Sequence, residues 1–247
     1  MTNDKHTHCR GACPRRDPLL KRFFESRRRE RLSYQWTSHG PSFVVRHRSV
    51  HASGTQSGDH SRQNWAVTDP FDGGGVLVTG VMASGKSTIA DLLVRRFDRG
   101  VHVRGDEFRR MIVTGQDPIG RSLGHEAQRQ LDLRRRLTAM VANEYWRDGF
   151  TVVIQDIVVG EALPEVIDLL DISPLFVVVL APRSDVVARR ERDRPKTGYV
   201  NGWDVDALVT MFEETTPRCG LWLDSSDLSP AGTVEAILSR CDEARVK

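Results

Sequence analysis

One eight-residue segment constrains the fold of this chain more than any other. Residues 80–87 read GVMASGKS and are followed by Thr88. They match the pattern G-x-x-x-x-G-K-[ST], in which glycines allow a tight turn whose N–H groups point at phosphate oxygens. An apolar run, VLVTG, ends at the first glycine, and a helical pattern follows the loop. These flanks favour a phosphate-binding loop at a helix N-terminus over a glycine turn with an incidental lysine.

The loop also predicts how a nucleotide is held. Lys86 is expected to bridge the β- and γ-phosphates of ATP, and the Ser87 hydroxyl is expected to ligate Mg²⁺. The remaining contacts from this loop to the nucleotide are expected from Gly80, Ser84, Gly85 and Thr88. A P-loop of this kind does not by itself say what happens to the phosphate.

Hydrophobic patterning after residue 75 predicts an α/β domain. The expected strands cover 76–80, 101–106, 150–156, 175–182 and 221–224. The expected helices cover 86–97, 107–113, 125–149, 186–194, 204–214 and 233–240. Strands that alternate with helices predict one five-stranded parallel sheet with helices on both faces. Ligands of such a sheet bind at the carboxyl ends of its strands.

The type of P-loop protein follows from what accompanies the loop. The guanine-reading pattern N-K-x-D is absent, and no D-x-x-G follows the third expected strand. The domain is also short for an ATPase module that works in rings. A compact kinase is therefore the most economical interpretation, with residues 75–247 as the P-loop kinase domain.

Asp106 and Arg109 are the candidates for handling the phosphoryl acceptor. Asp106 ends the second expected strand, at the same sheet edge as the P-loop, where a carboxylate can take the proton of an attacking hydroxyl. Arg109 follows one helical turn later and can hold a phosphate or carboxylate of the substrate. The alternative is that Asp106 is simply the N-cap of a helix.

Two further sites are open to two interpretations each. Asp156 closes the third expected strand, where P-loop proteins place an acidic group near Mg²⁺, or it orders the local loop. Arg190 and Arg194 share one face of an arginine-rich helix after the fourth strand. They form either a cationic lid over ATP, with Arg190 also catalytic, or part of a solvated basic helix.

From residue 76 to its C-terminus, the chain resembles P-loop kinases of the chloramphenicol phosphotransferase-like group, distantly related to polynucleotide 5′-kinases, gluconate kinase and zeta toxins. GVMASGKST, GDEFRRM, VVIQD and RRERDRPKTGY carry this resemblance. It implies a sheet order of 2-3-1-4-5, ATP and Mg²⁺ as cofactors, and a small-molecule hydroxyl as acceptor. It also implies that Asp106 is the catalytic base. The spacing of Asp106 and Arg109 is similar to the pair that polynucleotide kinases use for their acceptor.

Residues 1–74 differ in composition from the rest of the chain. Residues 1–72 contain 13 Lys and Arg against 7 Asp and Glu, together with six of the eight histidines. Low apolar content predicts a basic, disordered extension. The helical segment expected at 18–32 can contact nucleic acid, although a solvated tail is the more common outcome. His6, His8, Cys9 and Cys13 do not match a common zinc spacing.

The sequence therefore predicts an ATP-dependent phosphotransferase that acts on a small-molecule hydroxyl. The alternatives are a polynucleotide 5′-hydroxyl kinase and a nucleotide-gated binding protein with little catalysis. No run approaches the roughly 20 apolar residues of a membrane span, and the N-terminus lacks the apolar core of a secretory signal. Four scattered cysteines do not suggest a disulfide framework, so we expect a cytoplasmic protein without a membrane partner.

Overall fold

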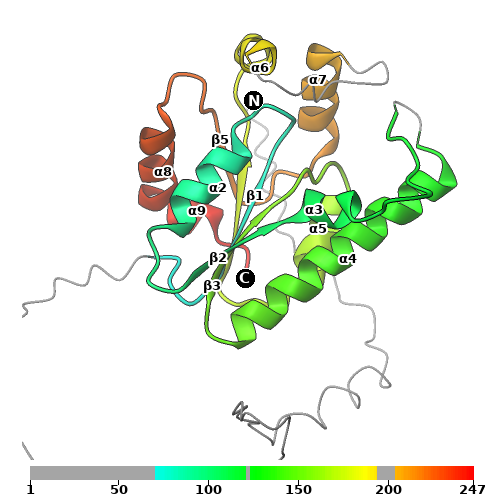
Figure 1. Cartoon of the computed structure of the whole chain (residues 1–247). Coiled ribbons are helices and arrows are strands. Elements are labelled where there is room, and N and C mark those ends of the chain that lie inside the picture. Colours follow the sequence, from blue (N-terminus) through cyan, green and yellow to red (C-terminus); the bar gives the residue numbers. More distant parts are fainter. Residues whose placement is uncertain (1–69, 121–122, 194–203) are drawn as a thin grey trace, which may run out of the picture. The chain divides into compact units, whose positions relative to one another are not determined.

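Five parallel strands form a single sheet in the order β2-β3-β1-β4-β5 (Figure 1). A computed structural model describes residues 70–120, 123–193 and 204–247 of the chain. The strands are β1 (Gly75–Thr79), β2 (Gly100–Arg104), β3 (Thr151–Gln155), β4 (Leu175–Leu180) and β5 (Leu221–Leu223). Strand β1 lies in the centre, with Leu77 paired to Ile154 of β3 and to Val177 of β4. The α/β fold class and the expected strand order are confirmed.

The helices follow the strands in the alternating pattern that the sequence predicts. Their bounds are α2 (Lys86–Val94), α3 (Gly105–Arg110), α4 (His125–Arg147), α5 (Ala162–Leu169), α6 (Ser184–Arg192), α7 (Val205–Thr215), α8 (Pro230–Ser239) and α9 (Cys241–Ala244). Helices α5 and α9 were not expected. Pro164 lies in the first turn of α5, where the missing N–H group does not cost a helical hydrogen bond.

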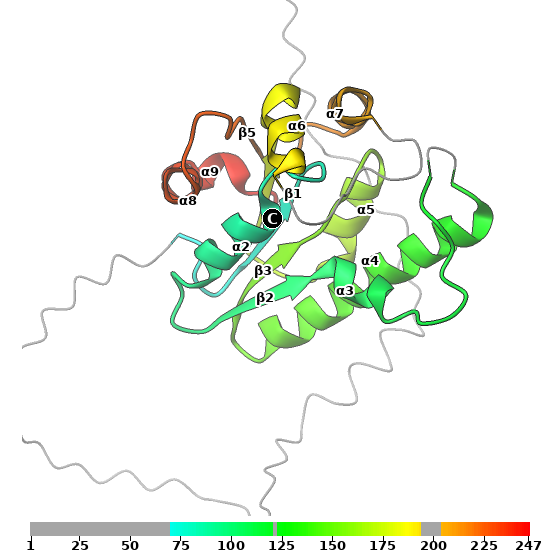
Figure 2. The same cartoon turned by 45° about the horizontal axis from the view of Figure 1, so that its top comes forward.

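The sheet separates two hydrophobic cores because successive side chains of a strand point to opposite faces. Val76 and Val78 of β1 pack on the face covered by α2, α8 and α9. Leu77 packs on the other face, beneath α4, α5 and α7. Figure 2 shows α2, α8 and α9 on one side of the strands and α4 and α5 on the other. Burial on both faces explains why β1, β3 and β4 are continuous apolar runs.

Residues just before β1 belong to the packed domain. Phe71 is fully buried, and its ring lies 4.5 Å from that of Phe176 in an edge-on contact. The backbone N–H of Gly73 donates to Thr151 Oγ1 at 2.8 Å, and Trp146 Nε1 donates to the Gly73 carbonyl at 2.9 Å. Phe71, which lies within the extension predicted from the sequence, therefore contributes to the core, and Gly73 is hydrogen-bonded to the domain. The rest of that extension lies outside the described residues.

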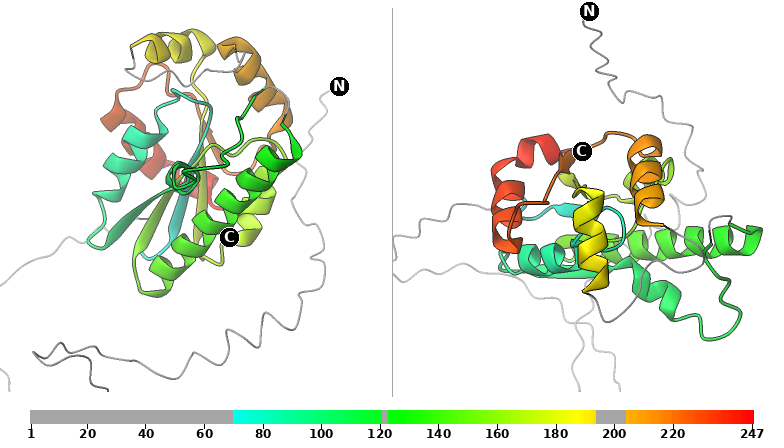
Figure 3. Two further views of the ribbon diagram at one scale, coloured as in Figure 1. Left: turned by 45° about the vertical axis from the view of Figure 1, so that its right-hand side comes forward. Right: turned by 90° about the horizontal axis from the view of Figure 1, so that it is seen from above.

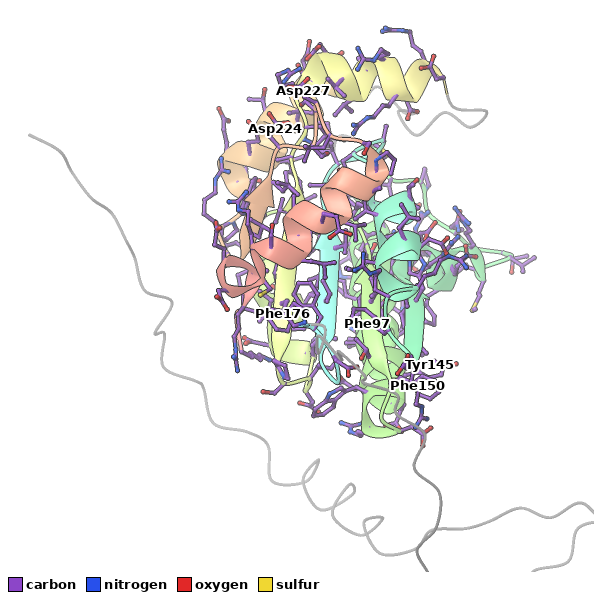
Figure 4. All side chains as sticks on the ribbon, turned by 90° about the vertical axis from the view of Figure 1, so that its left-hand side faces the viewer. Phe97, Tyr145, Phe150, Phe176, Asp224 and Asp227 are labelled. Carbon is purple, nitrogen blue, oxygen red and sulfur yellow. The ribbon has the colours of Figure 1, made fainter. Side chains whose placement is uncertain are left out.

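The two ends of the sheet are built differently. Helix α6 lies beyond the carboxyl ends of the strands (Figure 3). At the opposite end, Figure 4 shows Tyr145 and Phe150 side by side, with ring centroids 5.8 Å apart. The guanidinium of Arg99 lies 4.3 Å from the centroid of the Phe150 ring. Helix α6 thus lies at one end of the sheet, and the contacts among Tyr145, Phe150 and Arg99 lie at the other.

Within the described ranges, the structure has no helix that combines the length and the apolarity needed to cross a membrane.

Candidate active site

The loop between β1 and α2 has the backbone conformation that its glycines predict. Gly80 and Gly85 adopt φ values of 141° and 102°, and Ala83 adopts 60°. A Cβ on Gly80 would lie 2.4 Å from the carbonyl oxygen of Leu180, so a larger residue cannot fit there. Gly85 is the N-cap of α2 and offers no side-chain acceptor to the first turn. The N–H groups at the start of α2 are therefore left to an anion.

Lys86 is buried inside this loop, with 6% of its surface exposed. Its Nζ donates to the carbonyl of Val81 at 2.7 Å, across the turn. Burial of an ammonium group is costly unless acceptors surround it, so this position is suited to a polyphosphate. Ser87 and Thr88, the next two residues, remain exposed at the start of the helix.

A cavity of about 690 Å³ opens beside the loop. Its walls bring together most of the site residues predicted from the sequence, which are Ser84, Gly85, Lys86, Ser87, Thr88, Asp106, Asp156 and Arg190. Gly80 shapes the loop without lining the cavity, and Arg194 lies outside the described residues. Residues from the loop after β1, from the ends of β2 and β3 and from α6 thus converge at the carboxyl edge of the sheet, where ligands of such folds bind.

Asp106 faces this cavity from the first turn of α3. Its Oδ2 lies 2.7 Å from Nη2 of Arg110, and a third of its side chain is exposed. The N-cap of α3 is Arg104, so the alternative role of Asp106 as the N-cap is wrong. The carboxylate is therefore available to the cavity rather than committed to the backbone of its own helix.

Arg109, the predicted substrate ligand, points elsewhere and does not line the cavity. Its Nη2 donates to the carbonyl of Asp117, and its own carbonyl accepts from Gln116 Nε2 at 2.8 Å. Gln130 of α4 holds the same loop by donating to the Gly115 carbonyl and accepting from the Asp117 N–H. Burial lowers the pKa of Arg109. These contacts support a structural role for Arg109 in the loop after α3.

Arg134 of α4 also lines the cavity, although no sequence pattern singled it out. Its Nε lies 3.1 Å from Oδ2 of Asp156, and its Nη2 donates to Oδ1 of the same carboxylate. Asp156 is 4% exposed, and the side chain of Arg134 is 11% exposed. Burial lowers the pKa of Arg134 to about 10, which leaves it cationic at neutral pH. The two residues form a buried bidentate ion pair.

The surroundings of Asp156 bear on its two proposed roles. Its Oδ1 also accepts from the N–H of Ile157 at 2.7 Å. A Cβ on Gly105 would lie 2.1 Å from Oδ2, so α3 approaches the carboxylate as closely as a glycine allows. Both carboxylate oxygens of Asp156 are hydrogen-bonded, and these bonds hold Arg134 of α4 and the backbone at Ile157 in place. A metal ligand role would require Asp156 to share these oxygens.

Magnesium fits the oxygen donors of this cavity. Mg²⁺ prefers hard oxygen ligands and usually keeps several waters, so one or two protein ligands suffice when phosphates supply others. The exposed Ser87 hydroxyl meets this need, and Asp106 and Asp156 add carboxylates. Among the described residues, no cluster of three or more His, Cys, Asp or Glu side chains forms a cage for an ion. The donor set suits an ion that arrives with a nucleotide.

Arg190 connects α6 to the P-loop. Its Nη1 donates to the Ser84 carbonyl at 3.2 Å and its Nη2 to the Ser225 carbonyl at 2.9 Å. Burial, reinforced by the charge of Arg189, lowers its pKa. The hydroxyls of Ser84 and Ser225 are buried without a hydrogen-bond partner in the described part of the chain. Arg190 is therefore bonded to the loop rather than extended into solvent, and its role as a lid over ATP stays a prediction.

A second arginine fixes the neighbouring loop. Arg183, at the start of α6, donates to both carboxylate oxygens of Asp227 at 2.9 and 3.0 Å. Figure 4 shows Asp224 and Asp227 in the loop beside α6. The backbone N–H of Arg183 also donates to Ser226 Oγ at 2.8 Å. These bonds join the loop after β5 to α6 and so shape the cavity wall at Ser225.

Comparison with known proteins gives one family match. A family model described as an AAA domain matches residues 76–202. No curated protein matches the chain.

Solved structures with a similar fold include several kinases. A sugar kinase from Janibacter sp. HTCC2649 has a TM-score of 0.53 and 22% identity over 69% of this chain and 95% of that chain. The APS kinase CysC of Mycobacterium tuberculosis has 18% identity, a TM-score of 0.49 and coverages of 69% and 98%. A gluconokinase from Sinorhizobium meliloti 1021 has 18% identity, a TM-score of 0.46 and coverages of 68% and 91%. The first likeness shows a P-loop fold shared with a kinase, and the other two scores are too low to add to it.

Proposed function

Because the chain belongs to the AAA domain family of P-loop NTPases, we propose that it is an ATP-dependent phosphotransferase with a small-molecule hydroxyl as acceptor. One observation carries this proposal: Lys86 and Asp106, from different parts of the sheet edge, line the same cavity. The P-loop and this carboxylate thus share one cavity of about 690 Å³. Nucleotide binding alone does not need the carboxylate, whereas phosphoryl transfer does.

The nucleotide half of the cavity is formed by the P-loop and α6. The N–H groups at the start of α2 and the ammonium of Lys86 would bind the β- and γ-phosphates. Arg190 would close over the nucleotide from α6, where its guanidinium already contacts the loop. Bound Mg²⁺, held by Ser87, would neutralise charge on the phosphates. The role of Asp156 as a second ligand stays a prediction.

The reaction follows from these positions. The acceptor hydroxyl oxygen attacks the γ-phosphorus, and the bond from that phosphorus to the β–γ bridging oxygen breaks, so that ADP leaves. Asp106 accepts the hydroxyl proton as the new P–O bond forms. Lys86 and Arg190 stabilise the negative charge on the phosphoryl oxygens during transfer. Phosphorylated acceptor and ADP are the products.

Two further observations support a small-molecule acceptor over a polynucleotide. The resemblance to the chloramphenicol phosphotransferase-like group extends through the P-loop, Asp106 and Asp156. Arg109, which with Asp106 suggested a polynucleotide kinase, is engaged with the backbone of Asp117. A polynucleotide acceptor would also show a steep loss of affinity with salt, which a small acceptor would not.

The proposal is tested by an acceptor screen with ATP and magnesium that measures ADP release. Antibiotics, sugars, nucleosides and 5′-hydroxyl oligonucleotides make up the panel. Replacement Asp106→Asn should lower kcat with the best acceptor by about 100-fold or more and leave ATP affinity intact, because a general base is lost. Asp168→Asn, on the exposed side of α5, is the control and should behave as wild type. An unchanged rate in Asp106→Asn would remove the phosphotransferase assignment and leave a nucleotide-binding protein.

A further inference from the structure

Three arginines of the cavity wall come from elements other than the P-loop and α6, and we call this part of the wall the acceptor side. They are Arg104, Arg110 and Arg134. Arg110 is paired with Asp106 and with Glu107, each at 2.7 Å. Arg104 is exposed at the end of β2 and makes no ion pair within the described ranges. The acceptor side thus holds one arginine without a partner and one, Arg134, that is fixed from behind.

The fixing of Arg134 determines what it can offer to a ligand. Asp156 takes up Nε and Nη2 of the guanidinium, on the side toward β3. A guanidinium carries five N–H donors in a rigid plane, so the Nη1 donors remain for another group. Arg134 lines the cavity and is 11% exposed, which allows contact with a ligand and little contact with bulk water. Charge-assisted hydrogen bonds are strong in such a setting.

We propose that the phosphoryl acceptor carries an anionic group, a carboxylate, phosphate or sulfate, that Arg104 and Arg134 bind together. This inference rests on the proposed phosphotransferase function and names the chemical class of its second substrate. Arg104 precedes the catalytic carboxylate by two residues. An anion held there places the remainder of the acceptor next to Asp106. A compact molecule with a hydroxyl a few bonds from its anionic group would reach both.

The charges along the cavity agree with this assignment. Its lining contains the cations Lys86, Arg104, Arg110, Arg134 and Arg190 and the anions Asp106, Glu107 and Asp156. Lys86 and Arg190 belong to the nucleotide half. On the acceptor side, Arg110 and Arg134 have carboxylate partners and Arg104 has none in the described part of the chain. An acceptor anion would complete the pairing of charges and would orient the hydroxyl as well.

The role of Arg104 and Arg134 is tested best with acceptors that differ only in whether they carry the anionic group. The acceptor screen should therefore use matched sets with the same hydroxyl skeleton: glucose, gluconate and glucose 6-phosphate, and a nucleoside with its 5′-phosphate. We expect turnover to favour the charged member of a set by about 10- to 100-fold in kcat/KM, the value of one or two charge-assisted hydrogen bonds. Equal or better turnover of the neutral members would overturn the proposal while leaving the phosphotransferase function standing.

Variants of the two arginines separate acceptor binding from ATP binding. Arg104→Gln, at an exposed site, should raise KM for the charged acceptor by about 10-fold or more and leave KM for ATP unchanged. Arg134→Lys keeps the charge that Asp156 needs but loses the fork, and it should raise the same KM. Arg136→Gln is the control, because Arg136 is exposed on the same helix and does not line the cavity. An unchanged acceptor KM in Arg104→Gln would overturn the proposal.

If no compound in the panel is phosphorylated, a binding measurement tests the proposed anion site at Arg104 and Arg134. Calorimetry of the full chain, saturated with ADP and magnesium, would measure binding of inorganic sulfate. Binding that weakens by about 10-fold in Arg104→Gln and stays unchanged in Arg136→Gln supports the proposal. Absent binding, or binding that is equal in both variants, contradicts it. Failure of ADP itself to bind would refute the proposed function instead.

Discussion

The buried pair of Arg134 and Asp156 makes a quantitative prediction about stability. Both side chains are nearly inaccessible to water, so removal of one leaves an uncompensated charge in the protein interior. Two unit charges about 4 Å apart interact by about 4 kcal/mol at an effective dielectric constant of about 20. We therefore expect Arg134→Met and Asp156→Asn each to lower the free energy of unfolding by about 3–5 kcal/mol.

The double variant should behave differently from the sum of the two single variants. With both charges gone, the desolvation cost disappears as well, and we expect a total loss of about 2 kcal/mol or less. The coupling energy of the cycle should then be at least about 4 kcal/mol. In a domain of this size each kcal/mol shifts Tm by about 2–4 °C, so each single variant should melt about 6–20 °C below wild type.

The assay is urea denaturation followed by circular dichroism, analysed as a double-mutant cycle. Arg240 and Glu243 provide the control cycle, because they form a bidentate pair with 2.7 Å contacts at an exposed site. Exposed pairs couple by about 0.2–1 kcal/mol. The difference between the coupling energies of the two cycles should therefore report the effect of burial. Single-variant losses below about 1 kcal/mol at Arg134 and Asp156, or losses that simply add, would refute the reasoning.

Three further predictions concern the nucleotide site, pH and the N-terminal boundary. Arg190→Gln should raise KM for ATP by about 10- to 100-fold without changing KM for the acceptor, and an unchanged KM for ATP would contradict the lid role. Burial lowers the pKa of His102 from 6.5 in the folded state. The unfolded chain then binds the proton more readily, so stability should fall as pH drops below about 6.5, and His102→Asn should lose less stability between about pH 7.5 and about pH 5.5. If chemical denaturation shows that wild type and His102→Asn lose the same stability over this pH range, the prediction is contradicted. Deletion of residues 1–69 should leave turnover and stability intact. Deletion of 1–72 also removes Phe71, and it should lower the free energy of unfolding, measured by thermal denaturation, by about 3–5 kcal/mol. Equal stability of the two truncations would be evidence against this packing.

The sequence predicted the parts of the fold that depend on local patterns. The P-loop has glycines at positive φ, and its helix begins at Lys86 as expected. Strands β1, β3 and β4 are buried on both faces and read as apolar runs without alternation. The strand order was implied by resemblance, because the spacing of strands along a chain does not determine their neighbours in a sheet.

The sequence could not predict contacts that depend on how helices face the sheet. Arg134 stands in a run of three arginines on α4, and only the rotation of the helix decides which one reaches the cavity. Met140 of this helix is 59% exposed, whereas the smaller Ala139 and Ala142 are buried. Small side chains at these positions let α4 pack closely on the sheet. Hydrophobicity alone therefore does not identify the buried face of this helix.

Asp106 and Arg109 show a related limit. Their spacing placed both on one face of a helix, and the structure directs Asp106 into the cavity and Arg109 toward the loop at Asp117. A long side chain can extend in several directions from one turn of a helix, and a hydrogen bond to a nearby carbonyl determines which direction a guanidinium takes. Sequence spacing therefore predicts the location of a short side chain, such as that of aspartate, more reliably than that of arginine.

Binding of ATP with magnesium to Lys86→Ala, compared with wild type by isothermal titration calorimetry, tests the central claim most directly. Lys86 is buried in the loop that would hold the phosphates, so its loss should weaken binding by about 100-fold or more while the protein stays folded. Equal affinity of the two proteins for the nucleotide would contradict the assignment of this loop as the phosphate site, and with it the proposed reaction.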